Sequence, residues 1–259
     1  MAAAKKGKRR TARKARRAAA RSRQAAKRMV SRSARRAAKK EPGRARARAG
    51  ARLTLYGNWL SMPSSKVGLM LNMLGVPFEY RHVDVAAGQN RTPEFLAMNR
   101  FGQVPVLRHG NLTVVQSNAI LQYLADAFGR FGGRNRAERT RIAEWLFWEH
   151  DQLATGVGMS RLFARFMPQP EDVTTFMRRR GEQALDTLDA WLGDHSFLAG
   201  DRPTIADIAV FPWTTTADEG GFDLSRWPNV QAWAARMRAV KGVASPYDFM
   251  PKEDRPAAA

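Results

Sequence analysis

The chain has no cysteine among its 259 residues. Without a thiol of its own it cannot run a redox cycle between paired cysteines, and it cannot attack a substrate through a cysteine nucleophile. Any thiol chemistry would therefore have to come from a ligand. The lack of disulfides also fits a reducing compartment, so we expect a cytoplasmic protein.

Metal ligands and long apolar runs are scarce as well. The four histidines, His82, His109, His150 and His195, are scattered without the spacing of metal ligands, so we predict no metal site. The apolar runs are too short and too interrupted to cross a membrane, and we expect a soluble protein with no membrane span.

Negative charge is nearly missing from one part of the chain only. Residues 1–50 contain 21 Lys and Arg and a single acid, Glu41, which leaves 23 basic and 22 acidic residues for the rest. Almost all of the net charge of +21 therefore belongs to this segment, which has few large apolar residues. Because such a segment cannot bury enough apolar surface to offset chain entropy, we predict a disordered basic tail.

Three explanations of the tail stay open. It can bind nucleic acid or another polyanion through phosphate contacts, it can be a targeting peptide, or it can be an extension upstream of a true start at Met29 or later. The tail has no aromatic residue for base stacking. Binding of nucleic acid through it should therefore be indifferent to base sequence and sensitive to salt.

Residues 51–129 alternate between strand and helix patterns in the order β-α-β-α-β-β-α. The expected strands are 52–56, 78–83, 104–107 and 112–115, and the expected helices are 67–74, a short one from 92 and one after 117. A β-α-β crossover implies parallel pairing of the first two strands. Beyond a Gly- and Arg-rich linker at 128–135, residues 136–250 show only helical spacing, so the fold class is α/β followed by all-α.

Two segments of the first part carry the functional signal. In Gly102–Leu107, a proline at a strand start can lock a cis peptide bond, which leaves the backbone N–H and C=O of Val104 free to pair with another peptide. Shortly afterwards Gln116 and Ser117 begin a helix, whose free N–H groups and serine hydroxyl favour a carboxylate. Together the segments predict a site for a ligand that has a peptide backbone and an α-carboxylate.

With Leu55–Ser61 (LYGNWLS) and Pro203–Ile208 (PTIADI), these segments resemble the glutathione S-transferase family over most of residues 53–250. The resemblance implies a thioredoxin-like, glutathione-binding domain at 51–129 and an all-helical, substrate-binding domain at 136–250. It also implies glutathione as co-substrate, a homodimer and a role in detoxification. The expected reaction conjugates the thiolate of glutathione to small electrophilic, largely apolar substrates, while isomerisation and dehalogenation in the same fold stay open.

A second hypothesis comes from another functional class. The chain can be a non-catalytic module of the same family, such as the one in translation elongation factor 1 gamma, tethered to nucleic acid or ribosomes by its basic tail. Retention on immobilised glutathione together with thiol-conjugating activity favours the enzyme. Salt-sensitive RNA binding without either property favours the module.

The resemblance implies that Ser61 is the catalytic residue. In serine-type, theta-like bacterial members the active hydroxyl lies in a Leu-Ser-x-Pro loop after the first strand, and residues 60–63 have that form. A thiol with a pKa of about 8.5 needs a shift of roughly two units, or about 2.7 kcal/mol, and one hydrogen bond to a charged acceptor supplies about 1.5–3 kcal/mol. Asn58 and Tyr56 are the rivals, although strand alternation directs Tyr56 into the core.

The resemblance also implies which residues hold glutathione. They are Gln103 at the glycyl end, Val104 and Pro105 through the backbone, Gln116 and Ser117 at the γ-glutamyl end, and Asn90 near the glycyl carboxylate. Many relatives have an acid in place of Gln116. The amide still makes hydrogen bonds, but the ammonium group of the ligand loses its charge partner.

Helix capping is the structural alternative for several of these residues. Ser64 or Ser65 is expected to cap the helix that follows the first strand, and Ser117 can be an ordinary cap. Residues 204–207 (TIAD) have the form of a capping box, which is a folding signal.

Aromatic residues suggest a pocket for the second substrate. Trp59, Trp148, Phe163 and Phe166 are the candidates, with packing in the core as the alternative. The segment 148–151 (WEHD) suggests an acid–base cluster, but its pattern favours ordinary helix surface.

Overall fold

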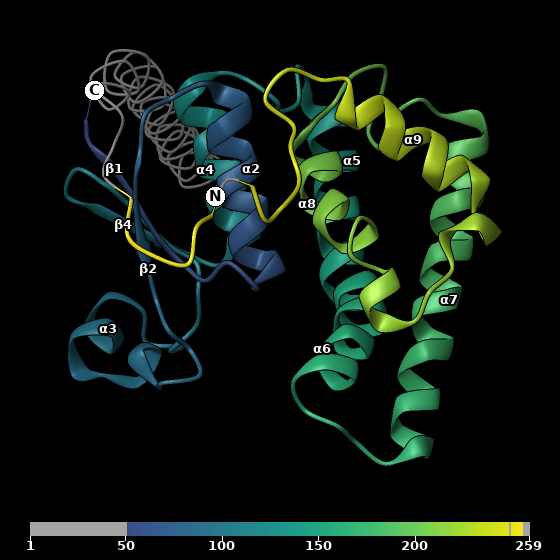
Figure 1. The fold of residues 1–259 in the computed structure, drawn as a ribbon. Helices are drawn as coiled ribbons and strands as arrows, with labels where there is room; N and C mark the ends of the chain where they lie inside the picture. Colours follow the sequence, from purple (N-terminus) through teal and green to yellow (C-terminus); the bar gives the residue numbers. More distant parts are fainter. Residues whose placement is uncertain (1–50, 249, 256–259) are drawn as a thin grey trace, which may run out of the picture. The chain divides into compact units, whose positions relative to one another are not determined.

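A four-stranded sheet organises the first half of the structure, a computed structural model that describes residues 51–248 and 250–255 (Figure 1). The strands are β1 (Leu53–Gly57), β2 (Glu79–His82), β3 (Val106–His109) and β4 (Leu112–Val115), in the order β2-β1-β3-β4. β1 and β2 pair in parallel, as predicted, while β3 is antiparallel to both β1 and β4. The predicted basic tail over 1–50 lies outside the described residues.

Strand alternation divides the sheet into two buried faces. Leu55 of β1 lies opposite Tyr80 and Leu107, and all three belong to the main apolar core. The next residues along the strands, Tyr56 and Val106, pack instead in a smaller apolar cluster on the other face. Tyr56 therefore faces a buried cluster, in agreement with the prediction from its strand position.

The helices of the first half are α2 (Met62–Leu74), α3 (Pro93–Met98) and α4 (Ser117–Phe128), with a 3-10 turn, η1 (Gln89–Arg91), before α3. Gly75 ends α2 in a left-handed conformation, with φ of 68°, where glycine meets no Cβ penalty. Thr92 caps α3 as expected. The order β-α-β-α-β-β-α is confirmed, and it is the thioredoxin-like arrangement that the sequence predicts.

The cap of α2 corrects one prediction. Ser61, rather than Ser64 or Ser65, is the N-cap, and its hydroxyl oxygen accepts a hydrogen bond from the Ser64 backbone N–H at 3.3 Å. Ser64 and Ser65 are buried inside the first turn because α2 already begins at Met62. A run of serines does not reveal which of them comes first in the helix.

The second half is helical throughout its regular structure. Its helices are α5 (Arg136–Trp148), the π-helix η2 (Glu149–Gly158), α6 (Met159–Arg165), α7 (Glu171–Asp194), α8 (Ile205–Thr214) and α9 (Pro228–Arg238), with 3-10 turns η3 (Asp218–Gly220) and η4 (Leu224–Arg226). Phe128 ends α4 and Asn135 caps α5, which matches the predicted linker. The sequence predicted helix over this stretch but not its ten-residue π-helical form, which the apolar spacing alone does not distinguish from an α-helix.

A close crossing joins the π-helix to α7. A Cβ atom built on Gly156 would lie 2.5 Å from the backbone nitrogen of Gly181, a separation that real Cβ contacts do not tolerate. Two glycines that face each other therefore let η2 and α7 approach backbone to backbone. This crossing fixes the position of η2, whose first turn borders the cavity described below.

The capping box at the start of α8 is confirmed. The Thr204 hydroxyl accepts from the helix backbone, and the Asp207 carboxylate accepts from the Thr204 N–H at 2.9 Å. Asp207 also accepts from the Leu198 N–H and from the Trp233 indole, and burial raises the pKa of this carboxyl. The residue therefore joins α8, α9 and the preceding loop from a completely buried position.

The C-terminal segment returns to the sheet, which the sequence did not predict. Arg255 and Tyr80 exchange two backbone hydrogen bonds, of 2.8 and 2.9 Å, along the free edge of β2. The Asp254 carboxylate accepts from the His82 N–H at 2.8 Å and pairs with Arg81 at 2.7 Å. These contacts occupy backbone groups at the edge of β2, which would otherwise be free to pair with another strand.

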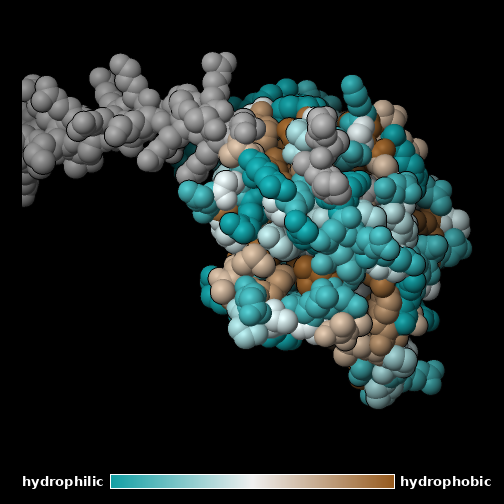
Figure 2. All heavy atoms as spheres, turned by 60° about the vertical axis from the view of Figure 1, so that its left-hand side comes forward, coloured by the Kyte–Doolittle hydropathy of each residue, from teal (hydrophilic) through white to brown (hydrophobic). Residues whose placement is uncertain are grey.

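One face of the molecule, shown in Figure 2, has a mixed apolar and polar surface. On the face turned forward in Figure 2, hydrophobic side chains lie in separate patches among hydrophilic ones. Phe147 is the most exposed of the large apolar side chains in the described part, at 77%. No helix within residues 51–248 and 250–255 is both long and apolar enough to cross a membrane.

Candidate functional site

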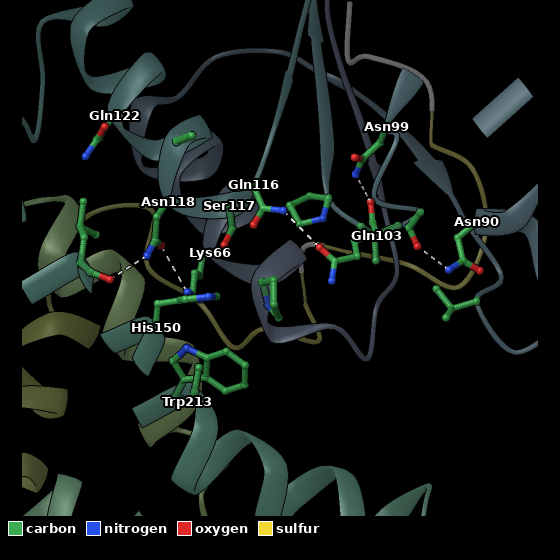
Figure 3. Close-up of a pocket in the computed structure, with 18 of the residues that line it drawn as sticks. Lys66, Asn90, Asn99, Gln103, Gln116, Ser117, Asn118, Gln122, His150 and Trp213 are labelled. Atoms are coloured by element: carbon green, nitrogen blue, oxygen red, sulfur yellow. Dashed lines mark hydrogen bonds between the residues drawn. The ribbon is translucent and has the colours of Figure 1, made fainter. Parts of the chain in front are cut away.

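A cavity of about 620 Å³ opens where the first turns of α2 and α4 meet the segment before β3 and the junction of α5 and η2 (Figure 3). All six residues predicted to bind the ligand line this cavity: Asn90, Gln103, Val104, Pro105, Gln116 and Ser117. All of them except Asn90 belong to the two motif segments. The fold therefore brings both motif segments to one cavity wall.

The segment before β3 presents its backbone to the cavity. The Val104–Pro105 peptide bond is cis, and Val104 lies before the first residue that pairs in the sheet, Val106. The Asn99 side-chain amide donates to the Gln103 carbonyl oxygen at 2.6 Å, which fixes the chain just before Val104 (Figure 3). This arrangement holds the backbone of Val104 outside the sheet ladder.

Gln116 has an unusual backbone conformation. Its φ of 70° and ψ of 117° lie in a region that residues with a Cβ atom rarely adopt. Its side-chain amide donates to the Gln103 side-chain oxygen at 3.1 Å, so the two motif segments are in direct contact (Figure 3). The conformation turns the chain from β4 into α4, which places Ser117 in the first turn at the cavity wall.

Asn90 has a structural task in this wall. It is buried, and its side-chain amide donates to the Gly102 carbonyl oxygen at 2.8 Å (Figure 3). The neighbouring Arg91 is exposed, lines the cavity and lies against Gly102, whose missing side chain leaves room for the guanidinium group. Arg91 was not predicted from the sequence. Its place directly after Asn90 in the same loop could have indicated that it lies at the cavity.

Ser61 lies next to the cavity rather than in its wall. Pro63, two residues later, lines the cavity, and the Ser61 oxygen caps α2 as described above. The rival Asn58 is engaged on both sides of its amide, because Nδ2 donates to the Val83 carbonyl at 3.0 Å and Oδ1 accepts from the Leu60 N–H at 3.0 Å. Asn58 thus shapes the loop that carries Ser61.

A buried arginine fixes the same loop from the helical half. Arg161 donates to the Leu60 carbonyl oxygen at 3.1 Å and pairs with Glu219 at 2.7 Å. It also donates to the Tyr247 hydroxyl at 3.0 Å, and the ring of Tyr247 meets that of Trp59 with centroids 6.0 Å apart. The residue that precedes Ser61 is therefore held by α6 and by the C-terminal segment.

A buried ion pair lies beside the cavity and corrects the interpretation of Glu149 as helix surface, whereas His150 and Asp151 are exposed as that interpretation expects. Glu149 is completely buried and pairs with Lys66 of α2 at 2.6 Å, with 2% of the Lys66 side chain exposed. Burial lowers the pKa of the Lys66 ammonium group, and the contact with Glu149 opposes that shift. Helical periodicity did not reveal Glu149 because its partner lies 83 residues away.

Within the described part of the chain no carboxylate lines the cavity, because Glu149, the partner of Lys66, lies buried behind it. The ionisable side chains that line the cavity are Lys66, Arg91 and His150. Together with the free N–H groups at the start of α4, this wall favours an anionic ligand. Among residues 51–248 and 250–255, no three His, Cys, Asp or Glu side chains gather in a way that could hold a metal.

Two family models match the chain in the order that the fold predicts. Residues 51–126 match the N-terminal domain of glutathione S-transferase, and residues 153–240 match its C-terminal domain. The chain belongs to the glutathione S-transferase family. Both segments of the predicted motif fall within the first match, and the helices behind the cavity continue into the second.

Individual glutathione S-transferases are similar over most of the described chain. Human glutathione S-transferase theta-2B is 31% identical over 73% of this chain and 82% of its own length. The crystal structure of a glutathione S-transferase from Pseudomonas fluorescens superposes with a TM-score of 0.72 at 36% identity, covering 76% of this chain and 99% of that one. The disulfide-bond oxidoreductase YghU of Escherichia coli is 30% identical over 64% of this chain and 62% of its own length.

Other structures of this fold were solved with glutathione or oxidised glutathione bound.

The aromatic residues predicted for the second substrate do not form one group. Trp148 meets Trp145 edge-on at 5.0 Å, and Phe163 is buried. Trp59 and Phe166 both lie near Arg161, Trp59 through Tyr247 and Phe166 with its ring 5.7 Å from the guanidinium carbon. The apolar side chains that line the cavity are others: Val85, Leu146, Phe147, Ala154 and Trp213.

Proposed function

We propose that the protein is a glutathione transferase that binds glutathione in this cavity and uses Ser61 to stabilise its thiolate. The observation that carries the proposal is the meeting of Val104, outside the sheet ladder, with the start of α4 in one wall that has no acidic side chain. A peptide with two carboxylates and a sulfur group matches that wall in shape and charge.

The binding mode follows from the positions of the donors. The γ-glutamyl carboxylate is bound by the first-turn N–H groups of α4 and the Ser117 hydroxyl, and Gln116 contacts the same end. Val104 pairs through its backbone with the cysteinyl part. At the glycyl end we assign the carboxylate to Arg91 and Gln103, while Asn90 positions the loop through Gly102.

The thiol step needs a donor aimed at the sulfur. The Ser61 oxygen accepts a hydrogen bond from the backbone of α2, so its own hydrogen is free to donate to the thiolate. Arg161 and Asn58 restrict the loop on either side of it, which lowers the cost of orienting the hydroxyl. The thiolate then attacks an electrophilic carbon of a small apolar substrate and displaces its leaving group.

For the second substrate we propose the apolar part of the same cavity. Leu146, Phe147, Ala154 and Trp213 come from the helical half and face the motif segments across the opening. Trp59 and Phe166, near the Ser61 loop, are candidates for its outer rim. Trp148 and Phe163 support the packing of this half.

Reduction of a disulfide is a second candidate, favoured by the similarity to a disulfide-bond oxidoreductase and by the lack of cysteine in this chain. The thiolate of glutathione would attack one sulfur of the substrate disulfide, form a mixed disulfide with it and release the other sulfur as a thiolate. All of the sulfur chemistry would then belong to ligands.

We also propose a cytoplasmic homodimer that acts in detoxification. Exposed Phe101, which does not line the cavity, offers apolar surface for contact with a second copy. Light scattering should give twice the chain mass of 29.0 kDa. A mass of one chain at working concentration would contradict the dimer.

Activity with an aryl halide as electrophile tests the main proposal. The purified chain should be retained on immobilised glutathione and should accelerate conjugation, and the variant Ser61→Ala should be retained but slower by roughly tenfold to a hundredfold. Retention without turnover of electrophiles or disulfides would reject the transferase. Failure of both retention and turnover, together with salt-sensitive RNA binding, would favour the non-catalytic module.

A further inference from the structure

We propose that the buried pair of Lys66 and Glu149 positions the γ-glutamyl end of the ligand site by fixing the first turn of α4 through Asn118. This inference rests on the proposed binding of glutathione. It adds two residues that do not contact the ligand themselves but hold Asn118, a residue of the helix that does. Lys66 and Glu149 are therefore positioning residues, and the group they position is the set of N–H donors that receives the ligand carboxylate.

Four separate elements converge on the pair. Lys66 comes from α2, Glu149 from the first turn of η2, Asn118 from the first turn of α4, and Trp213 from α8. The Glu149 carboxylate accepts from the Lys66 ammonium, from the Trp213 indole and from the Asn118 amide at 2.9 Å. One carboxylate thus joins the thioredoxin-like half to the helical half beside the cavity.

Both the oxygen and the nitrogen of the Asn118 amide bind the buried ion pair. Its Oδ1 accepts from the Lys66 ammonium at 3.3 Å, and its Nδ2 donates to Glu149 and to the Leu146 carbonyl oxygen at 3.0 Å (Figure 3). Its side chain contacts the ion pair, while its position beside Ser117 keeps its backbone in the first turn of α4. Asn118 therefore affects ligand binding through the position of that turn.

The first turn of α4 needs such an anchor. It follows directly on Gln116, whose backbone conformation is rarely adopted by residues with a Cβ atom. A conformation of this kind persists only where the surrounding contacts determine it. Asn118, two residues later, supplies three contacts to fixed partners on α2, α5 and η2.

Stability alone does not explain a buried ion pair. Replacing such a pair with neutral side chains of similar volume is often neutral or stabilising, because desolvation offsets the attraction of the charges. A pair that borders a cavity and orients a helix start has a further use, since donors held in place lose less entropy when a ligand binds.

The decisive variant removes both charges, Lys66→Met with Glu149→Gln. Calorimetric titration with S-hexylglutathione should show binding weaker by about tenfold in the folded double variant. In steady-state conjugation, KM for glutathione should rise by a similar factor while kcat at saturation stays within about twofold, because Ser61 is untouched. The control variant Arg202→Met removes an ion pair with Glu138 that lies away from the cavity, and it should bind as the wild type does.

Asn118→Leu tests whether the ion pair acts on ligand binding through Asn118. It also replaces the double variant as the test if that variant does not fold. It should weaken S-hexylglutathione binding by a similar factor, and adding it to the double variant should weaken binding no further. Wild-type affinity in either folded variant, or additive losses in the triple variant, would overturn the inference.

The same titration separates this inference from the proposed function. Binding by the wild type without turnover would reject the transferase. The positioning role would then be decided by the affinities of the variants for S-hexylglutathione. No binding by the wild type would reject both.

Discussion

At the scale of single residues, several side chains of the proposed site also have a folding task. Ser61 caps α2 two residues before Pro63, which lines the cavity, and Asn90 supports the loop in which Arg91 is exposed. The sequence predicted Ser61 and the two motif segments because short motifs of defined spacing carry them. It missed Arg91 and misjudged Glu149, because the partner that defines a buried charge comes from a distant part of the chain.

Removing the Arg91 guanidinium tests the glycyl end of the site. Arg91→Ala should raise KM for glutathione by roughly tenfold and leave kcat nearly unchanged, since a charge-assisted hydrogen bond to the carboxylate is lost in ground state and transition state alike. Arg100→Ala is the control, because Arg100 is also exposed but does not line the cavity. Equal KM values for both variants would remove Arg91 from the site.

Gln116 should show a conflict between stability and binding. Gln116→Gly relieves a positive φ and should raise the free energy of unfolding by about 1 kcal/mol in urea titration, while glutathione binds several-fold more weakly. Gln116→Ala keeps the backbone conformation and should weaken binding without that gain. If glycine gave no gain in stability, the backbone at Gln116 would not be strained.

At the scale of elements, periodicity found the strands and most helices but not their connections. The predicted strands at 78–83 and 112–115 agree with β2 and β4 within a residue or two, because alternation reports directly on burial. The π-helical form of η2 was not predicted, although helix was. The edge contact of Arg255 depends on a chain return that no local pattern encodes.

The crossing of η2 and α7 gives a prediction at this scale. Gly156→Ala would place a Cβ atom against the Gly181 backbone and should lower the free energy of unfolding by about 1–3 kcal/mol. Gly193→Ala in the same helix α7 meets only the Asn229 side chain, at 3.4 Å, and should be neutral or stabilising by about 0.5–1 kcal/mol. Thermal or urea unfolding of both variants measures the contrast, which equal effects would contradict.

At the scale of the whole molecule, charge separates the chain into two parts with different expected partners. Residues 51–259 are nearly neutral overall and hold the cavity, whereas residues 1–50 carry a formal charge of +20. Composition was sufficient to predict this division. It could not predict how α2, α4, η2 and α8 meet around Glu149, because that depends on packing between segments far apart in sequence.

Deleting residues 1–50 tests the division directly. The shortened chain should keep its kcat and KM for glutathione and lose its affinity for RNA or another polyanion. In the full chain that affinity should fall steeply between about 50 and 200 mM salt, as expected for phosphate contacts. Polyanion binding that survives the deletion would assign it to the folded part instead.

The most direct test of the account is the pKa of the thiol of bound glutathione, followed by the ultraviolet absorbance of the thiolate during a pH titration. We predict that binding to the wild type lowers this pKa by roughly two units from about 8.5, and that Ser61→Ala returns most of the shift while glutathione stays bound. A bound thiol with the same pKa in both proteins would contradict the assignment of Ser61 as the group that stabilises the thiolate.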